Sequence, residues 1–126
     1  MPATDLSPSA LIALLPSDAS LVPATAGKVI FAKGDPGDLM YVIVEGEAQI
    51  VIDGKPVETV RSGGILGEMA LIDSSPRSAS GIAKTQCLLI PIDEKRFRDL
   101  VAHRPEFALH VMRVLADRLR RMNSGR

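Results

Sequence analysis

The sequence has few of the residues that hold a protein together by covalent links or fix it in a membrane. Cys87 is its single cysteine, so no internal disulfide can form, and a cytoplasmic location is expected. Cys87 stands in an apolar run, which favours a core side chain over a nucleophile. No secretory signal is recognisable and no apolar run approaches the length of a membrane span, so we expect no membrane insertion.

An excess of charge of one sign is missing as well. Fifteen basic and fifteen acidic residues leave a formal net charge of zero, which argues against a protein that coats nucleic acid or acidic membranes. The basic stretch near the C-terminus is by default a solvated face, with an acidic partner or nucleic acid as the alternative. It contains Arg113, Arg118, Arg120, Arg121 and Arg126.

Groups that would support catalysis or metal binding are also scarce. The two histidines, His103 and His110, fall in the C-terminal part and have no acidic or histidine partners on the predicted strands, so no metal site is expected. No nucleophile–base pair is recognisable, and we predict no enzymatic activity.

What the chain does contain is a series of short strand-like runs separated by turn formers. They span residues 21–24, 29–31, 39–44, 47–52, 55–61, 79–83 and 86–92. Asp53-Gly54 is a signal for a type I′ hairpin, and the turn formers of residues 33–38 end an earlier strand. Many short strands at close spacing favour a mainly β fold, a β-roll of the jelly-roll type.

Helices are expected on both sides of this roll. Asp5 or Ser7 caps a short N-terminal helix that ends at Pro16. Asp93 caps a first C-terminal helix, and Pro105 begins a second one. We predict a single domain over residues 1–126, made of an N-terminal helical segment (1–20), the roll (21–92) and the C-terminal helices (93–123).

The last predicted helix is apolar over an unusually wide arc. The residues at helical spacing are Phe107, Val111, Val114, Leu115, Leu119 and Met122, and Ala108, Leu109, Met112 and Ala116 widen the arc. Such a helix lies in a groove of the roll, covers a ligand, or packs against a helix of another chain, and the sequence leaves these alternatives open.

Residues 67–80 combine several features of an anion site. Gly67 stands before a short apolar helix, whose free amide groups and dipole attract negative charge. Arg77 can bind a phosphate through two parallel hydrogen bonds, and Ser78 adds a neutral donor. Glu68 would repel a phosphate unless the ligand also offers a hydroxyl to the carboxylate. A ribose 2′-OH beside a 3′,5′-cyclic phosphate fits that description.

This segment resembles the phosphate-binding cassette of cyclic nucleotide-binding domains. The family includes the catabolite activator protein, the regulatory subunits of cyclic-AMP-dependent kinase and cyclic-nucleotide-gated channels. Its pattern Gly-Glu-x-Ala/Gly-Leu, then Pro-Arg-Ser/Ala/Thr-Ala, is matched by residues 67–71 and 76–79. The resemblance implies that Glu68 binds the ribose 2′-OH and that Arg77 binds the cyclic phosphate. The cassette residues implied in binding are Gly67, Glu68, Met69, Ala70, Arg77, Ser78 and Ala79.

The resemblance also bears on the base. Family members that prefer cyclic GMP tend to have Thr after the arginine, so Ser78 favours cyclic AMP. Alignment of Arg118-Leu119 with the last helix of the catabolite activator protein places Met122 as an apolar cap over the base and Asn123 as its hydrogen-bonding partner. No helix-turn-helix follows, so direct gene regulation is not supported.

The predicted function is therefore a stand-alone sensor or regulatory module that binds cyclic AMP, or cyclic GMP, as its ligand. It signals through movement of its C-terminal helix, to a protein partner or by self-association. The alternative is an interaction or oligomerisation module with the same roll that binds no nucleotide. We expect Arg77→Ala to abolish most binding and to leave the fold intact.

Overall fold

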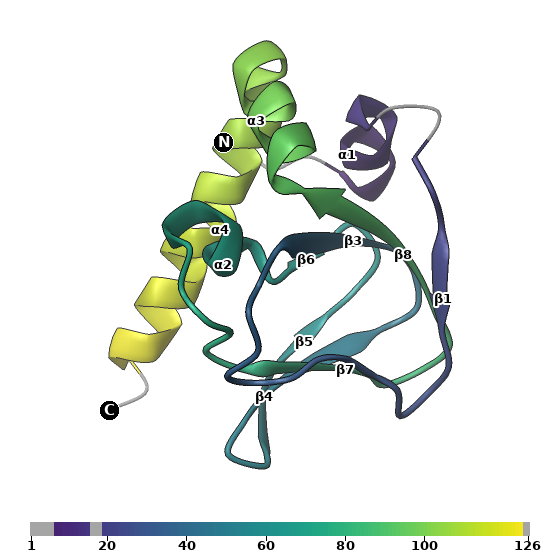
Figure 1. Cartoon of the computed structure of the whole chain (residues 1–126), viewed down its shortest axis with the longest axis vertical. Helices are drawn as coiled ribbons and strands as arrows, with labels where there is room; N and C mark the ends of the chain where they lie inside the picture. The colour runs from purple at the N-terminus through teal and green to yellow at the C-terminus, as the bar shows by residue number, and fades with distance from the viewer. Residues whose placement is uncertain (1–6, 16–18, 125–126) are drawn as a thin grey trace.

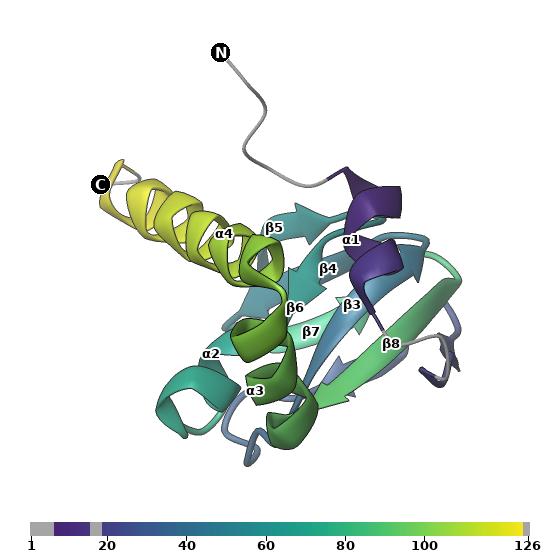
Figure 2. The same cartoon turned by 90° about the horizontal axis from the view of Figure 1, so that it is seen from above.

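The strands curl into a roll, with α1 and α3 near one end and α4 along the side (Figures 1 and 2). The structure is a computed structural model that describes residues 7–15 and 19–124, apart from the side chains of Pro8 and of residues 122–124. Within this part the elements are α1 (Pro8–Leu14), β1 (Val22–Ala24), β2 (Val29–Phe31), β3 (Leu39–Glu45), β4 (Ala48–Ile52), β5 (Lys55–Val60), β6 (Ile65–Leu66), α2 (Glu68–Asp73), β7 (Ser80–Ala83), β8 (Cys87–Asp93), α3 (Glu94–His103) and α4 (Pro105–Ser124). The predicted fold class is confirmed.

Two antiparallel four-stranded sheets make up the described roll, in the orders β1-β8-β3-β6 and β2-β7-β4-β5. Alternate residues of β3 and β8 point to opposite faces, as the pleat requires. Met40 and Ile92 belong to the core beneath the helices, whereas Ile43 and Leu89 belong to the core inside the roll. Since both faces of this sheet are covered, its strands are apolar almost throughout.

The core beneath the helices joins α1, α3 and α4 to the sheet that contains β3 and β8. Phe107 of α4 is fully buried there and meets Phe97 of α3 edge to face, with 5.9 Å between ring centroids. Leu11 of α1 is also fully buried. Full burial of such a side chain contributes roughly 1.5–3 kcal/mol, so this cluster fixes the start of α4 on the roll.

Turns and caps follow the local sequence signals closely. Asp53 and Gly54 have φ values of 51° and 80°, as a type I′ hairpin requires. The Ser7 hydroxyl accepts from the backbone N–H of Ala10 at 3.2 Å and caps α1, while Asp5 and Pro16 lie outside the described residues. The Asp93 carboxylate caps α3 in the same way.

The helix α4 has two apolar faces. Phe107 and Val111 point into the core, whereas Leu109, Met112 and Leu119 are 49%, 60% and 59% exposed. Leu119, predicted on the same stripe as the core residues, therefore faces outward. In the part of the chain that the structure describes, no helix combines the length and apolar character needed to cross a bilayer.

Candidate functional site

The predicted anion-binding segment forms a short helix between two left-handed residues. Gly67, with φ 75°, precedes α2, and Ser74, with φ 60°, ends it. The Asp73 carboxylate accepts from the backbone N–H of Ser75 at 3.0 Å and from its hydroxyl, and these hydrogen bonds lower the pKa of Asp73. The loop after the helix is thereby turned back, so that Arg77 lies beside the residue where the helix began.

Arg77 is drawn into the protein and is only 6% exposed. Its Nη1 donates to the carbonyl of Gly67 at 2.8 Å and its Nη2 donates to the carbonyl of Leu39. Its backbone pairs with the turn between β2 and β3, through Asp35 and Gly34, both at 2.8 Å. Burial lowers the pKa of the guanidinium, because desolvation disfavours the charged form. Arg77 therefore also contributes to stability, so that a folded Arg77→Ala variant is expected to be less stable than the wild type.

Two glycines let the backbone approach this arginine. A Cβ at Gly67 would lie 2.3 Å from Nη1 of Arg77, and the positive φ at this position also favours glycine. A Cβ at Gly37 would lie 2.2 Å from the Cβ of Ala70 and 3.0 Å from Nε of Arg77. The turn before β3 and the start of α2 consequently close over the guanidinium from two sides.

Glu68 is 2% exposed and is paired with the C-terminal helix. Nη1 of Arg118, on α4, donates to Oε2 of Glu68 at 2.7 Å. The other donors of Arg118 reach both carboxylate oxygens of Glu58 on β5, at 2.9 and 3.2 Å, and the carbonyl of Ile65 at 2.9 Å. Burial opposes the charge of Arg118, but the two carboxylates outweigh it and raise its pKa. We call this group, Glu58–Arg118–Glu68, the clasp.

Within residues 67–80, one buried side-chain donor and one buried side-chain acceptor have no hydrogen-bond partner among the described residues. They are Nε of Arg77 and Oε1 of Glu68, and both atoms are buried. Buried polar atoms are nearly always paired in folded proteins, so an unpaired donor and acceptor in one segment call for an explanation. A ligand with an anionic oxygen and a neighbouring hydroxyl supplies what both atoms lack.

Comparison with known proteins gives the family. The sequence model of the cyclic nucleotide-binding domain family matches residues 21–104, which are two thirds of the chain. The chain belongs to the cyclic nucleotide-binding domain family. The resemblance seen in the cassette is thus confirmed over the whole roll and α3.

Relatives of this cyclic nucleotide-binding domain include regulators and channels. The CRP-like cAMP-activated global transcriptional regulator of Mycobacterium tuberculosis is 34% identical over 125 residues, which cover 95% of this chain and 55% of the regulator. A cyclic nucleotide-gated potassium channel of Rhizobium etli is 39% identical over 98 residues, which cover 78% of this chain and 27% of the channel. The chain therefore spans about half, or less, of the length of these relatives.

Solved structures share the fold. The cAMP-bound form of PfPKA-R superposes with a TM-score of 0.71 at 25% identity, covering 84% of this chain and 37% of the other. The EAL enzyme Bd1971 matches in its cAMP-bound form, with a TM-score of 0.63 at 35% identity, covering 84% and 29% of the two chains. Its cGMP-bound form matches equally well, with a TM-score of 0.65 at 33% identity, covering 84% and 30%.

The other predicted site residues of this cyclic nucleotide-binding domain are placed unevenly. Ala70 is buried against the turn at Gly37, and Ala79 is 9% exposed. Met69 is 49% exposed and Ser78 is also exposed. The structure thus places Gly67 beside the buried guanidinium of Arg77 and Ala70 beside the same turn at Gly37. It pairs Glu68 with Arg118 and leaves Met69 and Ser78 at the surface. The side chains of Met122 and Asn123 lie outside the described residues.

Glu58 and Arg118 were not predicted as site residues. The sequence predicts Arg118 by default within a solvated basic stretch, but its side chain is only 14% exposed. One sequence signal could have found it, because Arg118 continues the spacing of Val111 and Val114 on the inner face of α4. An arginine on such a stripe needs a buried acidic partner.

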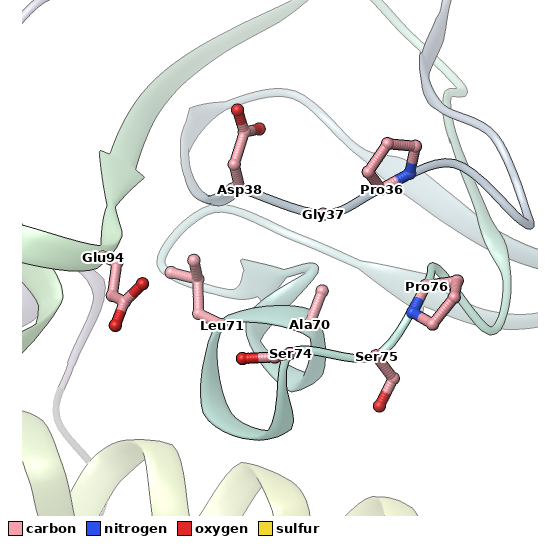
Figure 3. A pocket seen from close by; sticks show the side chains of 9 residues that line it. All are labelled: Pro36, Gly37, Asp38, Ala70, Leu71, Ser74, Ser75, Pro76 and Glu94. Carbon is pink, nitrogen blue, oxygen red and sulfur yellow. The ribbon is translucent and has the colours of Figure 1, made fainter.

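Two hollows flank the cassette. Figure 3 shows one of about 250 Å³, lined by Pro36, Gly37, Asp38, Ala70, Leu71, Ser74, Ser75, Pro76 and Glu94. The carboxylates of Asp38 and Glu94 make it unfavourable for a phosphate. The other hollow, of about 270 Å³, lies between residues 58–65 and the inner face of α4, where Arg118 forms part of its wall. The described residues contain no cluster of three or more His, Cys, Asp or Glu side chains that could hold a metal ion.

Proposed function

We propose that this chain binds a 3′,5′-cyclic nucleotide, with cyclic AMP favoured over cyclic GMP. The unpaired Nε of Arg77 and Oε1 of Glu68 carry the proposal. A phosphate oxygen accepts from the first and a ribose 2′-OH donates to the second. Hydrogen bonds to charged groups contribute roughly 1.5–3 kcal/mol each, so these two alone favour a ribose cyclic phosphate substantially. The cAMP-activated regulator among the relatives supports the same class of ligand.

The preference for cyclic AMP over cyclic GMP rests on a single residue. Ser78 stands where family members that prefer cyclic GMP tend to have threonine. Bd1971, whose cAMP-bound and cGMP-bound forms resemble this chain equally, shows that the fold itself does not choose between the bases. The base is expected in the hollow between β5 and α4, because Arg118, the partner of Glu68, forms part of its wall.

We further propose that α4 carries the response. Glu68 is buried under Arg118, so a nucleotide reaches Oε1 only when the clasp loosens. Binding and the position of α4 are then coupled, and the coupling acts equally in both directions. Glu58 holds Arg118 from β5, outside the cassette, and so stabilises the closed position in the absence of ligand.

The outward face of α4 is proposed to pack against a second copy of this chain. Its apolar residues follow the three–four spacing of a coiled-coil seam: Leu109, Met112, Ala116 and Leu119. A seam of this kind pairs with its own copy about a two-fold axis. Leu119→Glu should lower the average mass in analytical ultracentrifugation, whereas Val57→Glu, at another exposed apolar residue, should not. Equal masses for the wild type and Leu119→Glu would contradict self-association.

Calorimetric titration with cyclic AMP, cyclic GMP and linear AMP tests the main proposal. We expect binding of both cyclic nucleotides, tighter for cyclic AMP, and much weaker binding of linear AMP, which lacks the cyclic diester. Tighter binding of cyclic GMP would overturn only the proposed preference for cyclic AMP and not the proposed binding of a cyclic nucleotide. If no ligand gives heat at millimolar concentration, the alternative of an interaction module without nucleotide is correct.

Glu58→Gln tests the role of the clasp and leaves the proposed phosphate and ribose contacts, Arg77 and Glu68, unchanged; Glu58 also lines the hollow expected to take the base, and Gln keeps its size there. Replacing a charged hydrogen-bond partner of Arg118 by a neutral one costs the closed state about 0.5–1.5 kcal/mol, so cyclic AMP should bind about 2–10 times more tightly. Glu47→Gln is the matched control, because it also neutralises a carboxylate that pairs with an arginine. The partner is Arg61, with 3.1 Å between its Nε and Oε2 of Glu47, and this pair does not include a residue of α4. Unchanged affinity in Glu58→Gln would contradict a clasp that opens on binding.

A further inference from the structure

The guanidinium of Arg77 lies on the aromatic ring of Phe31, a residue outside the predicted site. Cζ of Arg77 is 4.3 Å from the centroid of the Phe31 ring, within the range of a cation–π interaction. The ring of Tyr41 stacks with Phe31, with 6.2 Å between centroids and 14° between planes. These residues come from β2, from β3 and from the loop after α2, so the stack joins the cassette to both sheets.

The Phe31 ring has little freedom to move. Phe31 is the direct cross-strand partner of Gly81, and a Cβ at Gly81 would lie 2.8 Å from the Cε2 and Cζ atoms of the ring. A Cβ at Gly67 would lie 3.3 Å from Cε2. Two glycines therefore make room for the ring, and the ring in turn fixes the plane on which the guanidinium of Arg77 lies.

The partners of this guanidinium suit an anion-binding group. Its described direct contacts are the carbonyls of Gly67 and Leu39 and the face of Phe31, and none of them is a carboxylate. A carboxylate would stabilise the buried cation but would also neutralise it and compete with a phosphate. The ring attracts the cation through its quadrupole and leaves its full charge available.

We propose that Phe31 is a positioning residue for the phosphate contact. Its ring shields the Arg77 guanidinium from water, fixes its orientation and leaves it charged. The proposal rests on the proposed function, since it assumes that Arg77 binds a cyclic phosphate. It adds a residue that lies outside the cassette, 46 positions before the arginine that it orients.

The test compares three variants in calorimetric titrations with cyclic AMP and in thermal unfolding. Phe31→Leu keeps an apolar side chain but loses the ring, Phe31→Tyr keeps the ring, and Phe97→Leu removes a ring from the aromatic pair on α3 and α4. Given the usual strength of cation–π contacts, Phe31→Leu should weaken cyclic AMP binding about 3–30-fold. Phe31→Tyr should stay within about twofold of the wild type. Phe97→Leu should lose thermal stability, and its effect on affinity should be smaller than that of Phe31→Leu, because Phe97 belongs to the core beneath the helices.

A double-mutant cycle with Arg77→Ala makes the test independent of the ligand. The loss of melting temperature caused by Phe31→Leu should shrink when Arg77 is already alanine, because the shared contact is gone. Additive losses would overturn the role of Phe31, as would equal affinities of Phe31→Leu and the wild type. If the cycle shows coupling but no variant or wild type binds cyclic AMP, the positioning contact exists and the proposed function is wrong.

Discussion

Replacing Glu68 with alanine should remove the ability of the chain to tell cyclic AMP from its 2′-deoxy analogue. Oε1 of Glu68 is buried and has no hydrogen-bond partner in the described part of the chain, and it is the expected acceptor for the ribose hydroxyl. One hydrogen bond to a charged acceptor contributes about 1.5–3 kcal/mol, so the wild type should prefer cyclic AMP about 10–150-fold. In Glu68→Ala the two ligands should bind within about threefold of each other.

The structure indicates that this substitution leaves a folded protein. Arg118 loses one partner at 2.7 Å but keeps the forked contact with Glu58 and the carbonyl of Ile65. The arginine is therefore not left as an unpaired buried charge, which is the outcome that costs most. A thermal unfolding curve with a single transition would verify this before any titration.

The assay is a pair of calorimetric titrations, with cyclic AMP and with 2′-deoxy cyclic AMP, on each protein. Both ligands need the same opening of the clasp, so the ratio of their dissociation constants cancels any effect on α4. Arg118→Ala is the matched control: it removes the other half of the ion pair and should preserve the ratio. A wild-type ratio near one, or an unchanged ratio in Glu68→Ala, would refute the assignment of the ribose contact.

Three further predictions concern single residues. Arg77→Ala should abolish most nucleotide binding and also lower the free energy of unfolding, because the partly buried carbonyls of Gly67 and Leu39 lose their donor, at about 1–3 kcal/mol each. A urea titration that gives the stability of the wild type would show that the arginine has no structural role. Gly37→Ala should destabilise the fold by about 1–3 kcal/mol and weaken binding, because the added Cβ would meet Ala70 at 2.2 Å and displace the cassette, which chemical denaturation and titration measure together. Burial raises the pKa of the Cys87 thiol, so the native chain should react slowly with maleimide at pH 7 and the urea-unfolded chain rapidly; equal rates in the two states would contradict its burial.

The sequence predicted the elements of the roll well because their signals are local. The strand at residues 29–31 and the turn at Asp53-Gly54 lie where alternation and turn chemistry placed them. The family pattern located Glu68 and Arg77, but their surroundings depend on residues far away in the chain. Arg77 bonds to a carbonyl 38 positions earlier, and Arg118 bonds to a carboxylate 60 positions earlier. The sequence around an arginine in a loop or helix is the same whether its side chain is solvated or buried. Its environment therefore follows only from the packed structure.

The helix α4 presents Arg118 to the cassette on one face and Leu109, Met112 and Leu119 to the outside on the other. A helix tilts as one body, so a shift that loosens the inner face also changes what the outer face offers to a second copy. If both proposed contacts exist, mass action links them, and the apparent dissociation constant for cyclic AMP depends on how concentrated the chain is. Dilution alone would then change the apparent affinity for cyclic AMP. Titrations at nanomolar and at high micromolar protein would give different dissociation constants.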